Sequence, residues 1–398
     1  MDQKRDSDPS AWGEATRLVR GGLDRSRHGE TAEALYLNSG FVYPDGETAA
    51  ARFAGELEGY VYARYGNPTV TMFEERLRLI EGAEACYGTA SGMSAVFGAL
   101  ACQLRAGDHV IASRALFGSC YQIITNILPR FGVSYTLVDG ADLDQWRGAF
   151  KANTRCVFLE SPSNPGLEVI DLKAVAEIAH AHGARVVVDN VFATPILQRP
   201  LELGADIVVY SATKHIDGQG RCLGGAILSS LKFKEDELKP FLRHTGPSLS
   251  PFNAWVLLKG LETLKLRVLA QCAAAEQIAR ALEATPGVER VLYPSLASHP
   301  QHALAMAQMK AGGTLVSFFV EGGRERAFDM LRGLKLIDVS NNLGDAKSLI
   351  THPASTTHRN IGEEARADMG ITEGMLRLSV GLEEPADLIQ DLRAALSD

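Results

Sequence analysis

The run SATKH at residues 211–215 places a lysine amine close to two hydroxyl groups. It follows residues 205–210, an apolar stretch rich in β-branched side chains that predicts a buried strand. A second buried strand is predicted at residues 184–190, and the carboxylate of Asp189 lies near its end. A lone lysine in a loop is usually solvated, and a lone aspartate at a strand end usually belongs to a turn. The functional prediction therefore depends on the joint placement of these groups.

An amine, a carboxylate and two hydroxyls at neighbouring strand ends together match the needs of pyridoxal phosphate (PLP). The amine of Lys214 would form a Schiff base with the aldehyde of this cofactor. Asp189 would keep the pyridine nitrogen protonated, so that the ring can act as an electron sink. The hydroxyls of Ser211 and Thr213 would donate hydrogen bonds to the phosphate. These four residues predict a PLP site.

A turn of small residues, Ser91-Gly92-Met93, is a candidate phosphate loop. It joins a predicted strand at residues 85–90 to an alanine- and leucine-rich helix that runs through residue 103. Glycine permits the backbone to approach a ligand closely, and the first N–H groups of a helix are free to bind an anion. Such turns are common, so this motif supports the PLP prediction only together with the lysine and the carboxylate.

Tyr62 and Arg64 precede a Gly-Asn-Pro turn and a predicted helix over residues 70–82, for which Thr69 is the expected cap. Arginine and tyrosine hydroxyl groups are natural partners of phosphate. Taken alone, the tyrosines of this stretch are more typical of packing residues.

Apolar strands alternate with helical stretches through the middle of the chain. Predicted strands lie at residues 109–112, 134–138, 156–160, 185–188, 207–210 and 225–228. This alternation predicts an α/β fold with a mostly parallel central sheet that is covered on both faces. Ligands of such sheets bind at the carboxyl ends of the strands, where Glu160, Asp189 and Ser211 are expected.

A long helix at residues 252–284 is expected to lead into a second, smaller α/β domain, whose clearest strands are 313–320 and 375–380. Arg377 lies among apolar neighbours in the last of these. It either points to water from an edge strand or binds an anion such as a substrate carboxylate, because burying an unpartnered guanidinium is costly. The predicted division is an N-terminal arm at 1–60 that wraps another subunit, a cofactor-binding domain at 61–255 and a C-terminal domain at 256–398.

Composition argues against several classes of function. The 398 residues carry a net charge of −8 without a dense basic stretch, which argues against nucleic acid as a partner. Six scattered cysteines without a C-x-x-C pair favour free thiols in the cytoplasm over a disulfide scaffold or a zinc site. The charged first residues do not resemble a signal peptide, and no apolar run is long enough for a membrane helix. His352 and His358 lack an accompanying cluster of carboxylates or cysteines, so no metal is expected.

Six motifs, taken in order, resemble the Cys/Met-metabolism family of fold-type I PLP-dependent enzymes. They are SGMSA at 91, ESPSNP at 160, VDN at 188, SATKH at 211, HPASTTH at 352 and LRLSVGLE at 376. The resemblance implies an aminotransferase-like α/β fold and PLP as the cofactor. It also implies a homotetramer, built as a dimer of dimers in which two subunits share each active site.

The resemblance also implies a role for each matching residue. Lys214 would carry the Schiff base, and Asp189 would hold the pyridine nitrogen. Phosphate ligands would be the Ser91-Gly92-Met93 turn, Ser211, Thr213, and Tyr62 and Arg64 of a neighbouring subunit. Asn164 would contact the cofactor's ring oxygen or the substrate, Arg377 would hold the α-carboxylate, and Asn342 would contact the substrate.

Two departures from the family pattern narrow the expected reaction. Where most members stack a tyrosine on the cofactor, Phe117 can stack here but has no hydroxyl to relay protons. The segment 342–349 resembles the sulfhydrylases that act on homoserine esters, with Asp345 and Lys347 either in the site or as a surface pair. Residues 216–221 and 246–255 resemble the enzymes that use the succinyl ester.

The implied reaction is γ-replacement of O-succinylhomoserine with sulfide, giving homocysteine and succinate, with Lys214 moving the Cα proton. Three alternatives remain at this point. The first is use of the acetyl ester, and the second is cystathionine synthesis or γ-elimination of a sulfur amino acid. The third is a PLP-binding regulator without turnover, since fold alone does not establish activity.

Overall fold

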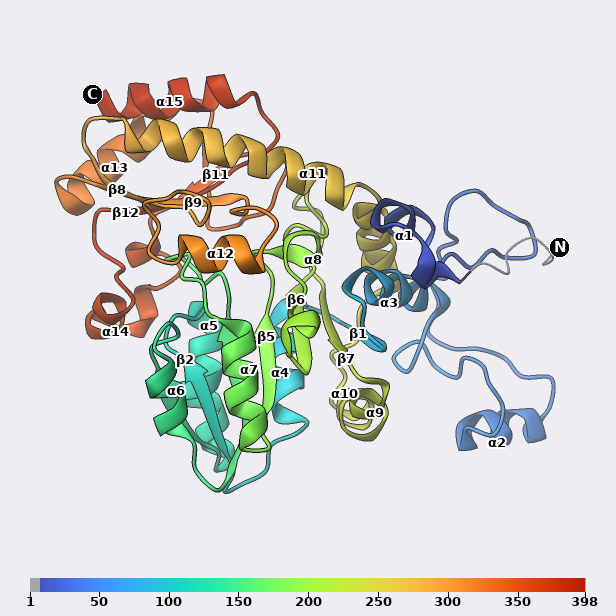
Figure 1. Ribbon diagram of the computed structural model, residues 1–398. Helices are drawn as coiled ribbons and strands as arrows, with labels where there is room; N and C mark the ends of the chain where they lie inside the picture. Colours follow the sequence, from blue (N-terminus) through green and yellow to red (C-terminus); the bar gives the residue numbers. More distant parts are fainter. Residues whose placement is uncertain (1–7, 398) are drawn as a thin grey trace.

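A seven-stranded sheet forms the centre of the larger part of the protein, in a computed structural model that describes residues 8–397 (Figure 1). Its strands are β1 (Ala85–Thr89), β2 (His109–Ser113), β3 (Ser134–Val138), β4 (Thr154–Glu160), β5 (Arg185–Asp189), β6 (Ile207–Ser211) and β7 (Gly225–Ser229). The spatial order is β1-β7-β6-β5-β4-β2-β3, and only the two pairs that involve β7 are antiparallel. The prediction of a mostly parallel α/β sheet is therefore confirmed.

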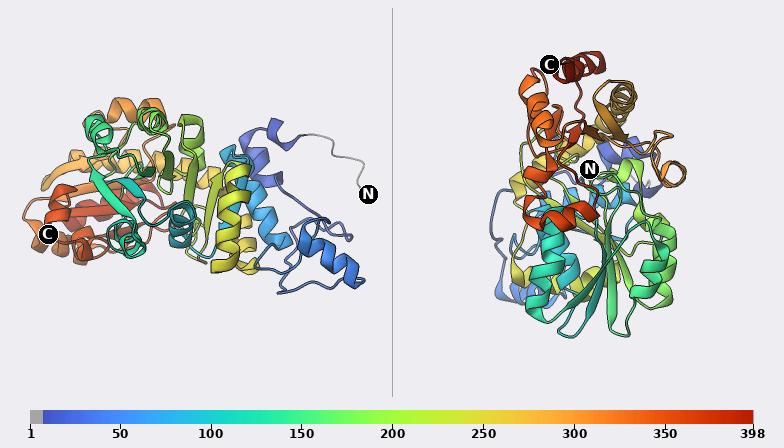
Figure 2. Two further views of the ribbon diagram at one scale, coloured as in Figure 1. Left: turned by 90° about the horizontal axis from the view of Figure 1, so that it is seen from below. Right: turned by 90° about the vertical axis from the view of Figure 1, so that its left-hand side faces the viewer.

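Helices cover both faces of this sheet, as the right-hand view of Figure 2 shows. One face is covered by α3 (Pro68–Glu81), α7 (Leu172–Ala181) and the first half of α11 (Pro251–Glu283), and the other by α4 (Gly92–Ala101) and α5 (Gly118–Gln122). Phe73 and Leu257 are fully buried in the first core, and Ala99 in the second. Because both faces are sealed by apolar contacts, polar chemistry is confined to the strand ends.

Helix α11 joins the two parts of the protein, as Figure 1 shows. Leu261 and Leu264 in its first half belong to the core of the large sheet, whereas Ala275 and Ile278 in its second half belong to the core of the smaller sheet. The predicted domain boundary at residue 255 lies within this helix. One continuous helix therefore packs on both sheets.

The smaller sheet has the order β10-β11-β12-β9-β8. Its strands are β8 (Val288–Leu292), β9 (Leu315–Val320), β10 (Asp338–Val339), β11 (Leu349–Thr351) and β12 (Met375–Ser379), and α13 (Gly323–Gly333) and α15 (Pro385–Ser397) pack against it. Arg377 lies on β12 between two neighbouring strands and is 1% exposed. Of the two interpretations of this arginine, the structure excludes a solvent-facing side chain on an edge strand.

The N-terminal segment extends away from both sheets (Figure 1). Helix α1 (Glu14–Arg20) packs on α3 and α11 through the buried Leu18, whereas α2 (Gly46–Ala54) buries no residue. Val42 is 95% exposed and Phe53 is 60% exposed on this segment. Apolar side chains in water are costly, so this surface is suited to contact another chain.

Helix α3 begins slightly earlier than the sequence pattern predicts. Pro68 is its first residue, and the side chain of Asn67 caps it by accepting a hydrogen bond from the backbone N–H of Thr69 at 2.9 Å. Thr69 is therefore not the cap, because a proline at the first helical position moves the cap to the preceding asparagine.

Shorter helices fill the connections. They are α6 (Leu143–Ala149), α8 (Thr194–Leu197), α9 (Leu231–Phe233), α10 (Lys239–Thr245), α12 (His302–Gln308) and α14 (Glu363–Asp368). Over residues 8–397, no helix combines the length and the apolar character needed to cross a membrane.

Candidate active site

A cavity of about 220 Å³ opens at the carboxyl ends of the parallel strands. Ten of the thirteen predicted site residues line it, namely Ser91, Gly92, Met93, Phe117, Asn164, Asp189, Ser211, Thr213, Lys214 and Arg377. Arg377 comes from the smaller sheet, so the cavity lies where the two sheets meet. The remaining three predicted residues are Asn342, which touches Lys214, and Tyr62 and Arg64, which lie elsewhere.

The N-terminus of α4 forms one wall of this cavity. Ser91 caps the helix by accepting from the backbone N–H of Ser94 at 3.2 Å. A side chain on Gly92 would lie 2.5 Å from Cβ of Ser211, so only glycine lets this helix end approach β6. Gly92 and Met93 of the first helical turn line the same cavity as Ser211 and Thr213, in an arrangement that suits a phosphate, although the hydroxyl of Thr213 bonds here to the backbone of Gly224.

Lys214 lies just beyond β6, and its side chain is mostly buried. Its amine donates a hydrogen bond to Oδ1 of Asn342 at 2.5 Å. Burial, together with the positive charge of Arg377, lowers the pKa of Lys214 to about 8. A substantial fraction of this amine is therefore neutral near physiological pH, as a nucleophile or a base requires.

Asp189 ends β5 and is 8% exposed. Its Oδ1 accepts from the backbone N–H of Val191 at 3.1 Å, and no cationic side chain among residues 8–397 forms an ion pair with it. Burial therefore raises the pKa of Asp189 to about 7. A carboxyl group in this state gains most from a cationic partner brought in by a ligand, such as a protonated pyridine ring.

Arg377 reaches the cavity from β12 with its hydrogen-bonding capacity partly used. Its guanidinium donates to Oδ1 of Asn164 at 2.8 Å and to the backbone oxygen of Asn341 at 3.0 Å. Its Nε is buried without a partner. Burial lowers the pKa of Arg377 to about 10, and an incoming carboxylate would both satisfy the free N–H and neutralise the charge.

The family model for Cys/Met metabolism PLP-dependent enzymes matches residues 15–397. The chain belongs to this family. O-succinylhomoserine sulfhydrylase of Mycobacterium tuberculosis strain H37Rv is 56% identical over 98% of this chain and 97% of that protein. The protein of the same name from Pseudomonas aeruginosa is 48% identical over 98% and 97%, and an L-methionine gamma-lyase of Porphyromonas gingivalis is 42% identical over 96% and 97%.

Among solved structures, one from Campylobacter jejuni has a TM-score of 0.94 at 33% identity, and the match covers 97% of this chain and 100% of that one. It is described as an O-acetylhomoserine (thiol)-lyase and carries a pyridoxyl-lysine phosphate. The predicted fold, family and cofactor class are confirmed by these similarities. The cavity fits the family's cofactor, because it combines three features. These are a lysine with a lowered pKa, a buried carboxyl group that forms no ion pair within residues 8–397, and a helix N-terminus suited to bind an anion.

Several cavity residues of this PLP-dependent enzyme were not predicted. Val191, Phe192, Leu223 and Leu343 contribute apolar surface, and Cys120 contributes a buried thiol. No local pattern in the sequence distinguishes these apolar side chains from ordinary core residues. The sequence predicts Glu160 at a strand end but assigns it no function.

Tyr62 and Arg64 do not reach this chain's own cavity. The guanidinium of Arg64 lies over the ring of Tyr65 at 4.7 Å and donates to the backbone oxygen of Arg243. Tyr62 is 43% exposed. Their assignment to a neighbouring subunit's phosphate site stays a prediction.

Asp345 and Lys347 also lie outside the cavity lining. The ammonium of Lys347 is 3.9 Å from Oδ1 of Asp345, and the lysine side chain is 69% exposed. Lys347 is therefore a surface residue, whereas Asp345 is buried outside the cavity lining, so neither interpretation describes both residues. His352 and His358 are both buried, and residues 8–397 contain no group of three or more potential metal ligands.

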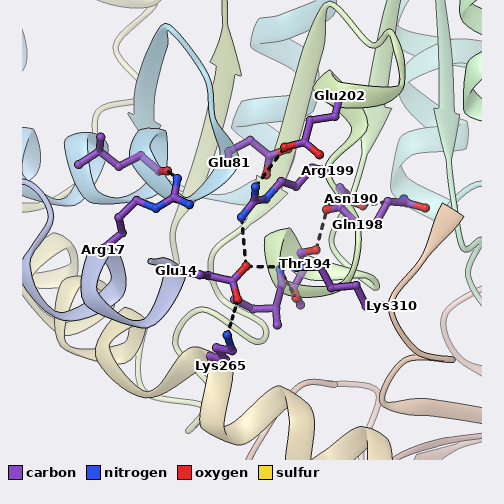
Figure 3. Close-up of polar contacts among 12 residues, drawn as sticks. Glu14, Arg17, Glu81, Asn190, Thr194, Gln198, Arg199, Glu202, Lys265 and Lys310 are labelled. Atoms are coloured by element: carbon purple, nitrogen blue, oxygen red, sulfur yellow. Dashed lines mark hydrogen bonds and ion pairs between the residues drawn. The ribbon is translucent and has the colours of Figure 1, made fainter. Parts of the chain in front are cut away.

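A buried polar network, here called the network behind the cavity, lies outside the cavity lining and includes Glu81, Asn190 and Gln198, which Figure 3 labels. The hydroxyl of Tyr210 donates to Oε2 of Glu81 at 2.5 Å and accepts from the side-chain amide of Asn190 at 2.6 Å. That amide also donates to the backbone oxygen of Gln198 at 2.9 Å. Burial raises the pKa of Glu81 to about 8. Because Asn190 directly follows Asp189, this network holds the end of β5, from which the carboxyl group of Asp189 enters the cavity.

A cluster of charges ties the N-terminal helix α1 to the rest of the protein (Figure 3). The carboxylate of Glu14 contacts Lys265 at 2.8 Å, Arg199 at 3.1 Å and Lys310 at 3.3 Å. These three cations come from α11 and from the loops beside α8 and α12. One partly buried carboxylate thereby links elements that are distant in sequence.

Proposed function

We propose that this chain replaces the succinyl group of O-succinyl-L-homoserine with sulfide, releasing L-homocysteine and succinate. The observation that carries the proposal is its 56% and 48% identity, over nearly the whole chain, to two proteins named O-succinylhomoserine sulfhydrylase. The lyase relative reaches 42% over a similar length. The cavity supports the reaction class, because it presents an amine, a carboxyl group and a substrate-binding arginine together.

Substrate binding is assigned to the residues around Arg377. Its unpartnered Nε and the adjacent amine-bearing wall suit the α-carboxylate of an amino acid. Asn164 holds this guanidinium through Oδ1 and leaves its amide N–H₂ free to contact the substrate or the cofactor. The apolar side chains of Leu223 and Leu343 border the cavity and leave room for the chain beyond the α-carbon.

Proton transfer is assigned to Lys214. Bound PLP supplies an electron sink that stabilises negative charge on the substrate carbon next to the amine. The amine of Lys214, with its pKa lowered to about 8, takes the proton from Cα and later returns it. Asn342 accepts a hydrogen bond from this amine and so keeps it directed at the cavity. At Cγ the bond to the succinate oxygen breaks, and a bond to the sulfur of hydrosulfide forms.

Phe117 is proposed to stack on the cofactor ring without taking part in proton transfer. It lines the cavity and has no hydroxyl group. A small nucleophile such as hydrosulfide needs little space and no positioned donor, so a phenylalanine suits it. We expect Phe117→Tyr to shift the preference from sulfide towards cysteine, and an unchanged ratio of the two rates would contradict this role.

We also propose a homotetramer with shared sites in the cytoplasm. The arm carries exposed apolar residues such as Val42, and Tyr62 and Arg64 lie outside this chain's own cavity. All six cysteines are free, in keeping with a reducing compartment. If sites are shared, subunits with Lys214→Ala and subunits with Arg64→Ala regain activity when dissociated and mixed. Absence of any recovery in mixed oligomers would favour self-contained sites.

The decisive test compares kcat/KM for O-succinyl- and O-acetylhomoserine, each with sulfide and with cysteine, on the PLP-loaded enzyme. We expect the succinyl ester with sulfide to give the highest value. A preference for the acetyl ester would change the substrate but not the reaction. A preference for cysteine, or faster breakdown of methionine to a 2-oxo acid than any replacement, would place the enzyme with the synthases or the lyases. A stable lysine-linked cofactor without turnover of any ester would support a regulator.

A further inference from the structure

We infer that Glu160 is a positioning residue: its carboxyl group holds the backbone N–H of Phe117 and thereby fixes the Phe117 ring against the cofactor. This assignment rests on the PLP cavity, and it is independent of which homoserine ester the enzyme prefers. Glu160 and Phe117 belong to two segments that are distant in sequence, the end of β4 and the loop before α5.

Glu160 occupies the end of β4, next to Asp189 at the end of β5, and the two residues are direct partners in the parallel register. Glu160 is 3% exposed and lines the cavity. Its Oε2 accepts a hydrogen bond of 2.8 Å from the backbone N–H of Phe117. Two buried carboxyl groups therefore lie side by side at the cavity, and that of Glu160 carries the hydrogen bond to Phe117.

The Phe117 loop needs such an anchor. Phe117 directly precedes α5, a helix of only five residues, so its N–H has no partner within a helix. Its side chain carries no polar atom that could fix the ring. On the opposite side the loop is confined, because a Cβ on Gly118 would lie 2.6 Å from the backbone oxygen of Thr357. The loop is thus held between a backbone oxygen and the carboxyl group of Glu160.

The charge state of Glu160 suggests which substitution will preserve the anchor. Burial, and then the neighbouring carboxyl group of Asp189, raise the pKa of Glu160 well above its usual value, which favours its neutral form. A neutral carboxyl group accepts a hydrogen bond through its carbonyl oxygen, as a glutamine side chain also does. Glutamine should therefore replace Glu160, whereas methionine matches its size but offers no comparable acceptor.

The test uses four PLP-loaded variants: Glu160→Gln, Glu160→Met, Phe117→Leu and the double variant Glu160→Met/Phe117→Leu. The readouts are the circular dichroism of the bound cofactor, which reports its contact with the ring, and kcat/KM for the preferred ester. We expect Glu160→Met to lower kcat/KM by roughly tenfold to a hundredfold, the usual range for leaving a buried donor unpaired. Its dichroism band should match that of Phe117→Leu, while Glu160→Gln remains within about threefold of wild type.

The double variant separates positioning from a direct role. If Glu160 acts through Phe117, the double variant is no worse than Phe117→Leu alone. Additive losses, or equal losses in the glutamine and methionine variants, would overturn the inference and assign Glu160 to the cofactor or the substrate. Should the methionine variant fail to fold, hydrogen exchange in the wild-type holoenzyme still decides, because the anchored Phe117 amide must exchange slowly. Fast exchange there would overturn the anchor.

Discussion

Asp189 and Asn190 are neighbours in the chain, yet their side chains lie in two different regions, the cavity and the polar network behind it. The two regions differ in how many of their polar groups have hydrogen-bond partners. On the cavity side, Asp189 has one backbone hydrogen bond, and Nε of Arg377 has no partner. In the network behind, the side chain of Asn190 bonds to both Tyr210 and Gln198. Both regions are buried, so burial alone does not distinguish them.

The difference lies in what completes each region. A buried polar group without a partner is costly, and natural proteins retain one where a ligand will supply the partner. The polar groups on the cavity side are therefore suited to bind a cofactor and a substrate. The network behind is almost complete without them, with Oε1 of Glu81 as an exception. Substitutions of cavity residues should lower activity and leave stability nearly unchanged. Substitutions in the network behind the cavity should change stability and leave activity nearly unchanged.

The largest expected effect is at Lys214. Lys214→Ala should abolish the absorbance band of the lysine-linked cofactor and lower kcat by more than about a thousandfold. The melting temperature of the apoprotein should change by only a few degrees, roughly, because the amine makes a single hydrogen bond. Lys347→Ala, at an exposed lysine, is the matched control. Substantial turnover by the Lys214 variant would contradict the assignment of proton transfer to this lysine.

A smaller loss is expected at Arg377. Lysine keeps the positive charge but cannot reproduce the two-pronged contact with a carboxylate, so Arg377→Lys should raise the KM for the homoserine ester by about tenfold to a hundredfold. The effect on kcat should be smaller. Arg324→Lys, in an exposed ion pair, provides the control. A loss confined to kcat would show that this arginine acts on the reaction rather than on binding.

The pKa of Lys214 predicts how fast the apoprotein binds PLP. Only the neutral amine attacks the aldehyde, and its fraction grows as pH rises through about 8. The rate of reconstitution, followed by absorbance, should therefore increase roughly tenfold between pH 7 and pH 9 for a group with this pKa. A rate that still rises steeply above pH 9.5 would mean that the amine keeps its ordinary pKa.

The smallest effect is expected behind the cavity, at Glu81. Its pKa is raised from 4.5 to about 8, so the folded state retains a proton that the unfolded state loses. This group's contribution to stability therefore declines as pH rises from about 4.5 to 8. Glu81→Gln keeps an acceptor for Tyr210 and removes the titration. Its melting temperature relative to wild type should consequently rise by a few degrees, roughly, between pH 5.5 and pH 8.

Activity provides the control for this last prediction. In Glu81→Gln, kcat per folded molecule should remain within about threefold of wild type, because the residue touches neither the cavity nor Lys214. A stability difference that does not depend on pH would show that Glu81 is already ionised in the folded protein. A large loss of kcat would show that the two regions are coupled through Asn190.

Much of the fold followed from local patterns. Strands β2 to β7 were predicted within a few residues, because buried parallel strands appear as short runs of β-branched side chains. The positions of Lys214 and Asp189 followed from the same runs, since each lies at or just beyond a strand end. The prediction that Thr69 caps α3 was wrong. Asn67 and Thr69 are both suitable cap residues, and the proline between them makes Asn67 the cap.

The sequence by itself determined the chemistry available to this protein: a lysine, a carboxylate and a small-residue turn at the ends of neighbouring strands, in the order that its family shares. Local spacing encodes such features, because strand and helix periods place side chains on definite faces. The family resemblance already assigned Arg377 and Asn342 to the site, but only the tertiary structure showed which contacts bring distant residues to the cavity. Arg377 enters from the middle of a second sheet, Asn342 meets the amine of Lys214, and Glu160 holds the Phe117 loop. These contacts depend on how two sheets and their loops pack, and no periodicity within a single segment records that.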